Sequence, residues 1–399
     1  MVTRNVLILG GRAPAALDHA RRFAHQGWTV RVADSIPCQI SGASRAVSAT
    51  LRVASPRHAP ARFVDDLRRA SLTYDIDLIV PTCEEVFFVS RYRDRLPAHV
   101  RVVADDFEKM RAVHSKWRFL SLARDCGVDV PDSARVASLD EARDWAGAQP
   151  VVLKPEYSRF GVHVRIYRHG IPAAAPPLAS LGHWIVQAFA EGREFCSYSV
   201  ADRGRLVAHS VYRPGWRMST SSSFYFEAVR IEAVRRFVEH FARKLDFTGQ
   251  VSFDWIQHEN GRMSVLECNP RATSGCHLFA PDDPLPNALN GTLPHAQHDA
   301  RGDAPGTLVE PSSNTPRMVS AVMLSAGLID ALRRGELRRW AHDYRRAFDV
   351  IGTPGDRGPI AGAIRDLASY ARLALAQRCN MREAATQDIE WDGQELPEA

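Results

Sequence analysis

Apolar and polar positions alternate along the chain in a way that predicts an α/β protein. Residues 5–9 form an apolar run that is typical of a buried strand, and Gly10-Gly11 follows as a turn. Pro14 then opens a helix to about His25, and residues 28–33 form the next strand. A further helix and strand continue the alternation, over about 59–72 and 77–80. The pattern predicts parallel strands covered by helices at the N-terminus.

Strands dominate the pattern in the middle of the chain, and helices dominate its last third. The spacing predicts strands over 151–154, 162–167, 184–189, 194–201 and 205–212. An amphipathic helix over 230–245 has an apolar face made by Val234, Phe237, Val238, Phe241 and Leu245. Residues 281–316 are rich in Pro, Asp, Asn and Gly, and the remainder to about 385 is mostly helical and Arg-rich. The Arg runs could contact nucleic acid, but a solvated helix face is the simpler interpretation.

Asn260-Gly261 between two apolar runs predicts a β-hairpin with a two-residue type I′ turn. In that register Glu259 pairs with Arg262, and Asp254 lies directly opposite Glu267. Asn269 shares the face of Glu267, and Arg271 follows it. Two opposed carboxylates repel each other, so the pair predicts a cation between them, and oxygen ligands of this kind suit Mg²⁺. The alternative is an exposed strand pair with incidental acids.

Composition places the chain among ordinary globular proteins. Of 399 residues, 45% are apolar and 24% charged, and no apolar run approaches the length of a membrane span. The N-terminal apolar run is also too short for a signal peptide. Seven cysteines without a CxxC pair argue against a zinc ribbon or a disulfide framework. We therefore expect a cytoplasmic protein, and a net charge of +5 gives no reason to expect a nucleic-acid partner.

Lysine is rare, which draws attention to the few positions that retain it. Of the 51 basic residues 47 are Arg, and the four lysines are Lys109, Lys116, Lys154 and Lys244. Lys154 closes an apolar strand and Lys116 opens a helix behind Ser115 as N-cap. A compact ammonium suits phosphate binding, so these two are candidates, whereas the other two fit solvated helix positions.

Four features share one order along the chain. Lys116 begins a helix, Lys154-Pro155 precedes a Ser/Gly loop, strand 185–190 leads to Glu191-Gly-Arg-Glu194, and Asp254 precedes Glu267-Cys-Asn269-Pro-Arg271. This order resembles the ATP-grasp superfamily, which includes D-alanine–D-alanine ligase, biotin carboxylase and the large subunit of carbamoyl-phosphate synthetase. The resemblance covers about residues 5–280. It implies an α/β (α+β) fold with a Rossmann-like pre-ATP-grasp domain at 1–112, an ATP-grasp domain at 113–280 and a linker with a mostly helical extension at 281–399. The ATP-grasp domain would have a small lobe at 113–183 and a metal-binding lobe at 184–280.

The resemblance implies a role for each of these residues. Lys116 and Lys154 would contact the ATP phosphates, under a loop from Ser158 to Gly161. Gln187 and the backbone of Ala188, Phe189 and Ala190 would meet the adenine edge, and Glu194 the ribose. Two Mg²⁺ ions, with Mn²⁺ as an alternative, would be held by Asp254, Glu267 and Asn269. Arg271 and Lys154 would be catalytic and stabilise the transferring phosphoryl group.

The chain departs from the family pattern in two places. The loop after Lys154 keeps a single glycine, Gly161, and carries the bulky Arg159 and Phe160. Residues 168–183 are short and rich in Pro and Ala where relatives often have a helix. Neither departure involves Asp254, Glu267 or Asn269, so the expectation of nucleotide binding is unchanged. The departures bear instead on which substrate the protein uses.

The implied activity is ATP-dependent activation of a small carboxylic acid as an acyl phosphate, followed by attack of an amine or a similar nucleophile. Arg213 and Arg217 are candidates for holding the substrate carboxylate, and Ser274 and Gly275 for lining the acceptor end. The C-terminal tail either covers one side of the active site or forms a homodimer contact.

Three other functions remain open. One is bicarbonate phosphorylation of the carbamoyl-phosphate-synthetase kind, and another is a nucleotide-binding regulatory protein without turnover. The third is an NAD-dependent oxidoreductase that uses residues 5–34, with Asp34 at the ribose. The motif there stops after Gly10-Gly11, short of the full G-x-G-x-x-G.

Overall fold

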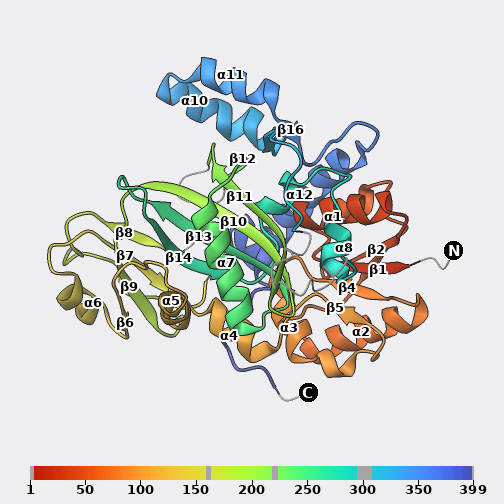
Figure 1. The fold of residues 1–399 in the computed structure, drawn as a ribbon, viewed down its shortest axis with the longest axis horizontal. Helices are drawn as coiled ribbons and strands as arrows, with labels where there is room; N and C mark the ends of the chain where they lie inside the picture. The colour runs from red at the N-terminus through yellow and green to blue at the C-terminus, as the bar shows by residue number, and fades with distance from the viewer. Residues whose placement is uncertain (1–3, 159–162, 218–222, 294–307, 398–399) are drawn as a thin grey trace, which may run out of the picture.

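The computed structural model describes residues 4–158, 163–217, 223–293 and 308–397, which build three β-sheets (Figure 1). The N-terminal sheet is parallel, with strand order β3-β2-β1-β4-β5, which is Rossmann-like as predicted. Helices follow most of its strands, as the pattern of apolar runs predicted. Its elements are β1 (Asn5–Leu9), α1 (Pro14–His25), β2 (Thr29–Asp34), β3 (Ala49–Arg52), α2 (Pro60–Thr73), β4 (Leu78–Val80), α3 (Glu85–Arg91), β5 (Arg101–Val102) and α4 (Phe107–His114).

A small antiparallel sheet of order β6-β9-β7-β8 lies at the opposite end of the molecule from the N-terminal sheet (Figure 1). Its strand β9 (Trp184–Ala188) pairs with both β6 and β7, so this sheet continues past residue 183, where we expected the small lobe to end. Trp184 and Val186 are buried in its core beside α6. The remaining elements of this part are α5 (Lys116–Asp125), β6 (Ser133–Val136), α6 (Leu139–Ala146), β7 (Val151–Pro155) and β8 (Arg165–Tyr167).

A seven-stranded sheet of order β14-β13-β10-β11-β12-β15-β16 occupies the middle of the molecule. Helix α7 packs its predicted apolar face on this sheet. Phe241 packs edge-on against Phe253, and Phe237 packs edge-on against Trp255, with 5.1 Å between the ring centroids in both pairs. Because side chains alternate along a strand, burying Phe253 and Trp255 under α7 turns Asp254 to the other face. The elements are β10 (Arg193–Asp202), β11 (Arg205–Pro214), β12 (Tyr225–Val229), α7 (Glu232–Leu245), β13 (Gly249–Gln257), β14 (Met263–Asn269), β15 (Arg317–Met318) and β16 (Phe348–Asp349).

The β13–β14 hairpin has a different turn from the one predicted. The amide of His258 donates to the carbonyl of Arg262, so the loop holds three residues, and only Gly261 of the Asn-Gly pair has a positive φ, +81°. This is the turn of three-residue hairpins, not type I′. Next to the turn, the strands therefore pair one residue out of the predicted register. A bulge between Trp255 and Asp254 brings the pairing back into that register. Asp254 therefore faces Glu267 as predicted, although Glu259 does not pair with Arg262.

The C-terminal third is mostly helical, as predicted, and returns to the N-terminal sheet. Helices α10 and α11 project from the body, whereas α12 lies beside α1 (Figure 1). None of the helices in the described ranges is long and apolar enough to cross a membrane. The elements are α8 (Leu285–Asn290), α9 (Ser320–Val322), α10 (Leu328–Arg334), α11 (Leu337–Arg346), α12 (Gly358–Gln377) and α13 (Met381–Thr386), with short helical turns at Ile40–Ala43, Arg93–Arg95, Ser274–Leu278 and Met323–Gly327.

Candidate functional site

Asp254 on β13 and Glu267 on β14 form an acidic pair on one face of the seven-stranded sheet. Burial and the repulsion of Glu267 raise the pKa of Asp254 to about 7. Burial also acts against the charge of Glu267, but the attraction of Lys116 and Lys154 outweighs it and lowers the pKa of Glu267 to about 2. One acid is thus held ionised by lysines, and the other would be stabilised by an added cation.

Lys116 and Lys154 reach this pair from the small-sheet side of the molecule. Lys116 Nζ lies 3.8 Å from Glu267 Oε2 and donates to the carbonyl of Ser158 at 2.9 Å. The two lysines are brought together because the N-terminus of α5 is bound to the end of β7: the Lys116 amide donates to the Glu156 carbonyl at 3.2 Å. Burial lowers the pKa of Lys154 to about 8, against the attraction of Glu267. Both ammonium groups are almost fully buried, so they are placed for an anionic ligand.

Asn269 and Arg271 extend the patch beyond the acidic pair. Asn269 Nδ2 donates to Asp254 Oδ2 at 3.4 Å, and Arg271 Nη2 donates to Asn269 Oδ1 at 3.2 Å. Arg271 Nε also lies 3.9 Å from Glu84 Oε1, so the guanidinium links the strand pair to the N-terminal sheet. The four residues predicted as the metal and phosphoryl-transfer end are therefore brought together.

The residues predicted to meet adenine and ribose lie on the last strand-forming residues of the small sheet, on the segment after it, and at the start of β10. Gln187 is buried on β9 and donates to Ser133 Oγ at 3.1 Å. The amides of Ala188 and Phe189 donate to the carbonyls of Asp132 and Pro150. These two N–H groups are therefore already used in hydrogen bonds within the protein. A contact of this segment with adenine would use backbone carbonyls or Ala190. Glu194 on β10 forms an ion pair with Arg217.

The two arginines predicted to hold the substrate, Arg213 and Arg217, are both engaged in ion pairs, and Arg217 pairs with Glu194. Arg213 is exposed and forms an ion pair with Glu227, which fits a solvated charge better than a carboxylate clamp. Ser274 and Gly275 begin the turn that follows Arg271. A side chain on Gly275 would come within 2.4 Å of Tyr198 Cβ, so glycine allows the turn to pack on β10. Ser158 is described, whereas Gly161 and its neighbours 159–162 lie outside the described residues.

Two residues of the site were not singled out from the sequence. The segment 82–85 lies at the carboxyl end of β4, an edge where open α/β sheets place ligand contacts. Glu85 accepts hydrogen bonds from the amides of Thr82 and Cys83 in this turn, whereas Glu84 faces Arg271. His114 is buried beside Lys116, and burial lowers its pKa to about 3. Only the fold brings these residues to the site.

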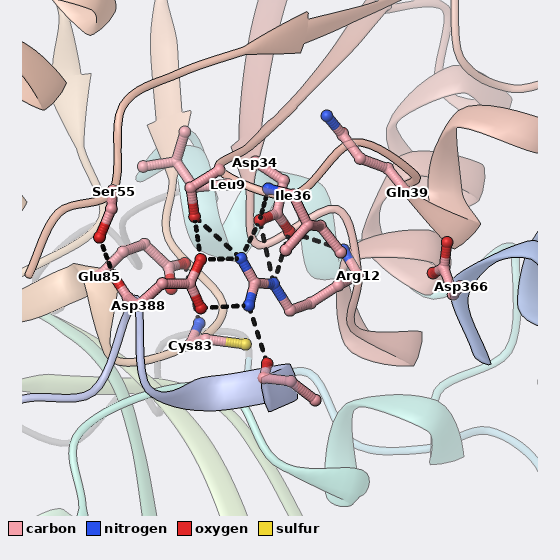
Figure 2. A network of polar contacts seen from close by, with 12 residues as sticks. Leu9, Arg12, Asp34, Ile36, Gln39, Ser55, Cys83, Glu85, Asp366 and Asp388 are labelled. Carbon is pink, nitrogen blue, oxygen red and sulfur yellow. Dashed lines mark hydrogen bonds and ion pairs between the residues drawn. The ribbon is translucent and has the colours of Figure 1, made fainter. Parts of the chain in front are cut away.

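Asp34, the candidate ribose acid of the dinucleotide hypothesis, is occupied by protein contacts (Figure 2). Arg12 donates to it from the backbone amide at 2.9 Å and from Nε at 3.0 Å. The same guanidinium donates to Asp388 from both terminal nitrogens, at 2.7 and 2.8 Å. The C-terminal segment therefore lies over this edge of β1 and β2, which argues against a dinucleotide there.

Residues 113–275 match the family model of the ATP-grasp domain. This part of the chain is an ATP-grasp domain. The matched range contains the two lysines, the acidic pair and Asn269 described above, so the resemblance stated from the sequence is confirmed.

Known relatives agree with the ATP-grasp assignment. The carbamoyl phosphate synthase large chain of Thermomicrobium roseum is 23% identical over 195 residues, which is 45% of this chain and 18% of that protein, so the chain spans less than a fifth of this relative. An L-amino acid ligase from Bacillus licheniformis has a similar fold (TM-score 0.54, 15% identity, 72% of this chain and 74% of that one). So has the N5-carboxyaminoimidazole synthetase of Staphylococcus aureus complexed with ADP (TM-score 0.59, 12% identity, 82% and 86%).

The residues of the ATP-grasp domain fit Mg²⁺ and a nucleotide phosphate. Two carboxylates and an amide oxygen are hard ligands, and a divalent cation would relieve the repulsion that raises the pKa of Asp254. Two buried ammonium groups and a guanidinium border the same acids and match the negative charge of a polyphosphate.

Proposed function

We propose that the chain is an ATP-dependent ligase. It would phosphorylate a substrate carboxylate to an acyl phosphate and couple the acyl group to an amine or a similar nucleophile, with release of ADP and phosphate. One observation carries this proposal: Lys154 from strand β7 and Lys116 from the start of α5 converge on the Asp254–Glu267 pair. Lysines, paired acids and a guanidinium in one buried patch suit phosphoryl transfer, which relies on positioning and charge.

Each part of the nucleotide would meet a different set of residues. Lys116 and Lys154 would bind the phosphates, with the loop after Ser158 above them. Gln187 and the carbonyls of residues 188–190 would face adenine. Glu194 would meet the ribose, which requires its ion pair with Arg217 to open or to be shared.

Asp254, Glu267 and Asn269 would hold the two Mg²⁺ ions. When bound, the metal supplies charge neutralisation for the phosphates. Asp254 must be ionised to serve as a ligand, and Glu267 is held ionised by the lysines.

The reaction would begin with attack of a substrate carboxylate oxygen on the γ-phosphorus, and the bond to the ADP oxygen would break. Arg271 and Lys154 would stabilise the charge on the transferring group. The amine would then attack the acyl carbon, and phosphate would leave with the original carboxylate oxygen. The turn at Ser274 and Gly275, held by a hydrogen bond from Ser210 Oγ to the Gly275 carbonyl at 3.0 Å, would border the acceptor. We assign residues 1–112 to the wall that faces this end, since Glu84 reaches Arg271 from there.

The test is Mg²⁺-dependent release of ADP and phosphate across a panel of carboxylic acids and amines. ADP release that requires one acid and one amine together supports the ligase. ATP binding without turnover on any pair favours a regulatory protein instead. Glu267→Gln should abolish turnover, and if turnover persists the metal assignment is wrong.

Bicarbonate phosphorylation is a second candidate, favoured by the match to a carbamoyl phosphate synthase chain. In this case bicarbonate alone would stimulate ADP release, and no other acid in the panel would be required.

A further inference from the structure

The last residues of the chain lie across the carboxyl edge of the N-terminal sheet, beside the ATP-grasp domain. Ser55 Oγ donates to the Asp388 carbonyl at 2.7 Å, and Arg57 Nη2 donates to Asp392 Oδ2 at 2.6 Å. Tyr92 Oη donates to the Pro397 carbonyl at 3.0 Å. Together with the ion pair of Arg12 and Asp388 (Figure 2), these contacts hold the C-terminal segment, residues 380–397, on the body.

Trp391 is the centre of this C-terminal segment and is 1% exposed. Its ring lies 4.8 Å from Phe87, 5.1 Å from Tyr157 in an edge-on arrangement, and 6.1 Å from His114, measured between ring centroids. Its backbone amide donates to Glu84 Oε2 at 3.1 Å. One residue of the C-terminal segment therefore contacts the N-terminal sheet and the ATP-grasp domain at once.

The groups that Trp391 contacts lead directly to the proposed phosphate site. Glu84 is the acid that lies 3.9 Å from Arg271. Tyr157 precedes Ser158, whose carbonyl accepts the hydrogen bond of Lys116. His114 lies two residues before Lys116, and neither of its ring nitrogens has a hydrogen-bond partner within the described parts of the chain. Displacing the indole would thus disturb the surroundings of both Arg271 and Lys116.

We propose that Trp391 is a positioning residue of the ATP site. Through Glu84 it fixes Arg271, and through Tyr157 it fixes the start of the loop that follows Lys154. The inference rests on the proposed function, because it assigns the site to ATP. The competing view is that Trp391 only anchors the C-terminal segment.

Gly393 offers a test that leaves the indole intact. It has φ +88°, and a Cβ there would lie 2.3 Å from Tyr157 Cδ2. Gly355 is a matched control, because it has φ +83° and no atom lies within 4 Å of its Cβ position. Gly393→Ala and Gly355→Ala share the same backbone cost, and only the first presses on Tyr157.

The experiment compares wild type, Trp391→Ala, Trp391→Phe, Gly393→Ala and Gly355→Ala. It measures Mg·ATP binding by calorimetry, KM for ATP and kcat with an active substrate pair, and the urea unfolding midpoint. We expect Trp391→Ala and Gly393→Ala to weaken ATP binding about tenfold, because small misplacements at such sites are costly. Trp391→Phe keeps the ring contact and should restore most of the affinity, and Gly355→Ala should match wild type.

The proposal is overturned if Trp391→Ala and Gly393→Ala lower the unfolding midpoint while KM and ATP affinity stay within about twofold of wild type. If Trp391→Ala does not fold, Gly393→Ala against Gly355→Ala decides the question. A wild-type protein that binds no Mg·ATP would refute the proposed function itself, so the two failures are distinguishable.

Discussion

Replacing Asp254 with Asn should stabilise the metal-free protein while it abolishes turnover. The pKa of Asp254 rises from 3.8 to about 7, first through burial and then through repulsion by Glu267. At about 1.4 kcal/mol per pKa unit, ionised Asp254 costs at most about 4 kcal/mol. Asn removes that cost but weakens the contact with Asn269, so we expect a net gain of about 1–2 kcal/mol.

The difference in stability between wild type and Asp254→Asn should depend on pH in a defined direction. A carboxyl whose folded pKa is raised binds its proton more readily in the folded state. Wild type therefore loses stability as the pH rises from 3.8 to about 7, whereas Asp254→Asn does not. The stability of the variant relative to wild type should rise by about 4 kcal/mol between about pH 4 and pH 7, so that the variant is the less stable protein at pH 4 and the more stable one above pH 7.

The assay is urea unfolding of both proteins at about pH 4 and pH 8 with the metal removed, and again with Mg²⁺. Mg²⁺ should stabilise wild type and leave Asp254→Asn unchanged. Asp140→Asn is the control, because Asp140 is an exposed surface acid, and its substitution should change little. A variant that is less stable than wild type at pH 8, or equally shifted at both pH values, would refute the reasoning.

Three further predictions concern other buried charges. Lys154→Met should weaken Mg·ATP binding by about 10- to 100-fold in calorimetry, the value of one charged hydrogen bond, and unchanged affinity would remove Lys154 from the site. Arg12→Ala leaves Asp34 buried without its cation and should lower the free energy of unfolding by about 3–5 kcal/mol, and a loss below about 1 kcal/mol would contradict the role of this network. Burial lowers the pKa of His277, but Cys276 and Asp18 raise it to about 10, so its stabilising charge is complete below pH 6.5 and disappears as the pH rises through 10. His277→Gln should lack that decline in the urea midpoint, and an identical decline in both proteins would refute the assignment.

The hairpin shows how far local pattern could predict the site. The opposition of Asp254 and Glu267 was predicted by counting outward from a two-residue Asn-Gly turn, and it is found because a bulge offsets the longer loop. Burial of Phe253 and Trp255 under α7 determines which face Asp254 occupies. The turn was wrong because Asn-Gly is compatible with both two- and three-residue loops. The bulge between Asp254 and Trp255 that restored the pairing was not part of the prediction.

The wall of the site could not be predicted from neighbouring residues. Trp391 meets Glu84 and His114 only because the chain returns to its N-terminal sheet after about 300 residues, and their spacing carries no periodic signal. Arg213 was a weak candidate for a related reason. In a chain with 47 arginines a surface ion pair such as that with Glu227 is common, and the residue type alone does not separate it from a substrate clamp.

The central claim is that the ATP-grasp domain transfers the γ-phosphoryl group to a carboxylate, and the fate of oxygen tests it most directly. An acid that supports ADP release is labelled with ¹⁸O in its carboxyl group, and the released phosphate is examined by mass spectrometry. The account predicts one labelled oxygen in each phosphate, because that oxygen bridges to phosphorus in the acyl phosphate and leaves with it. Phosphate that takes its fourth oxygen from water would contradict the account.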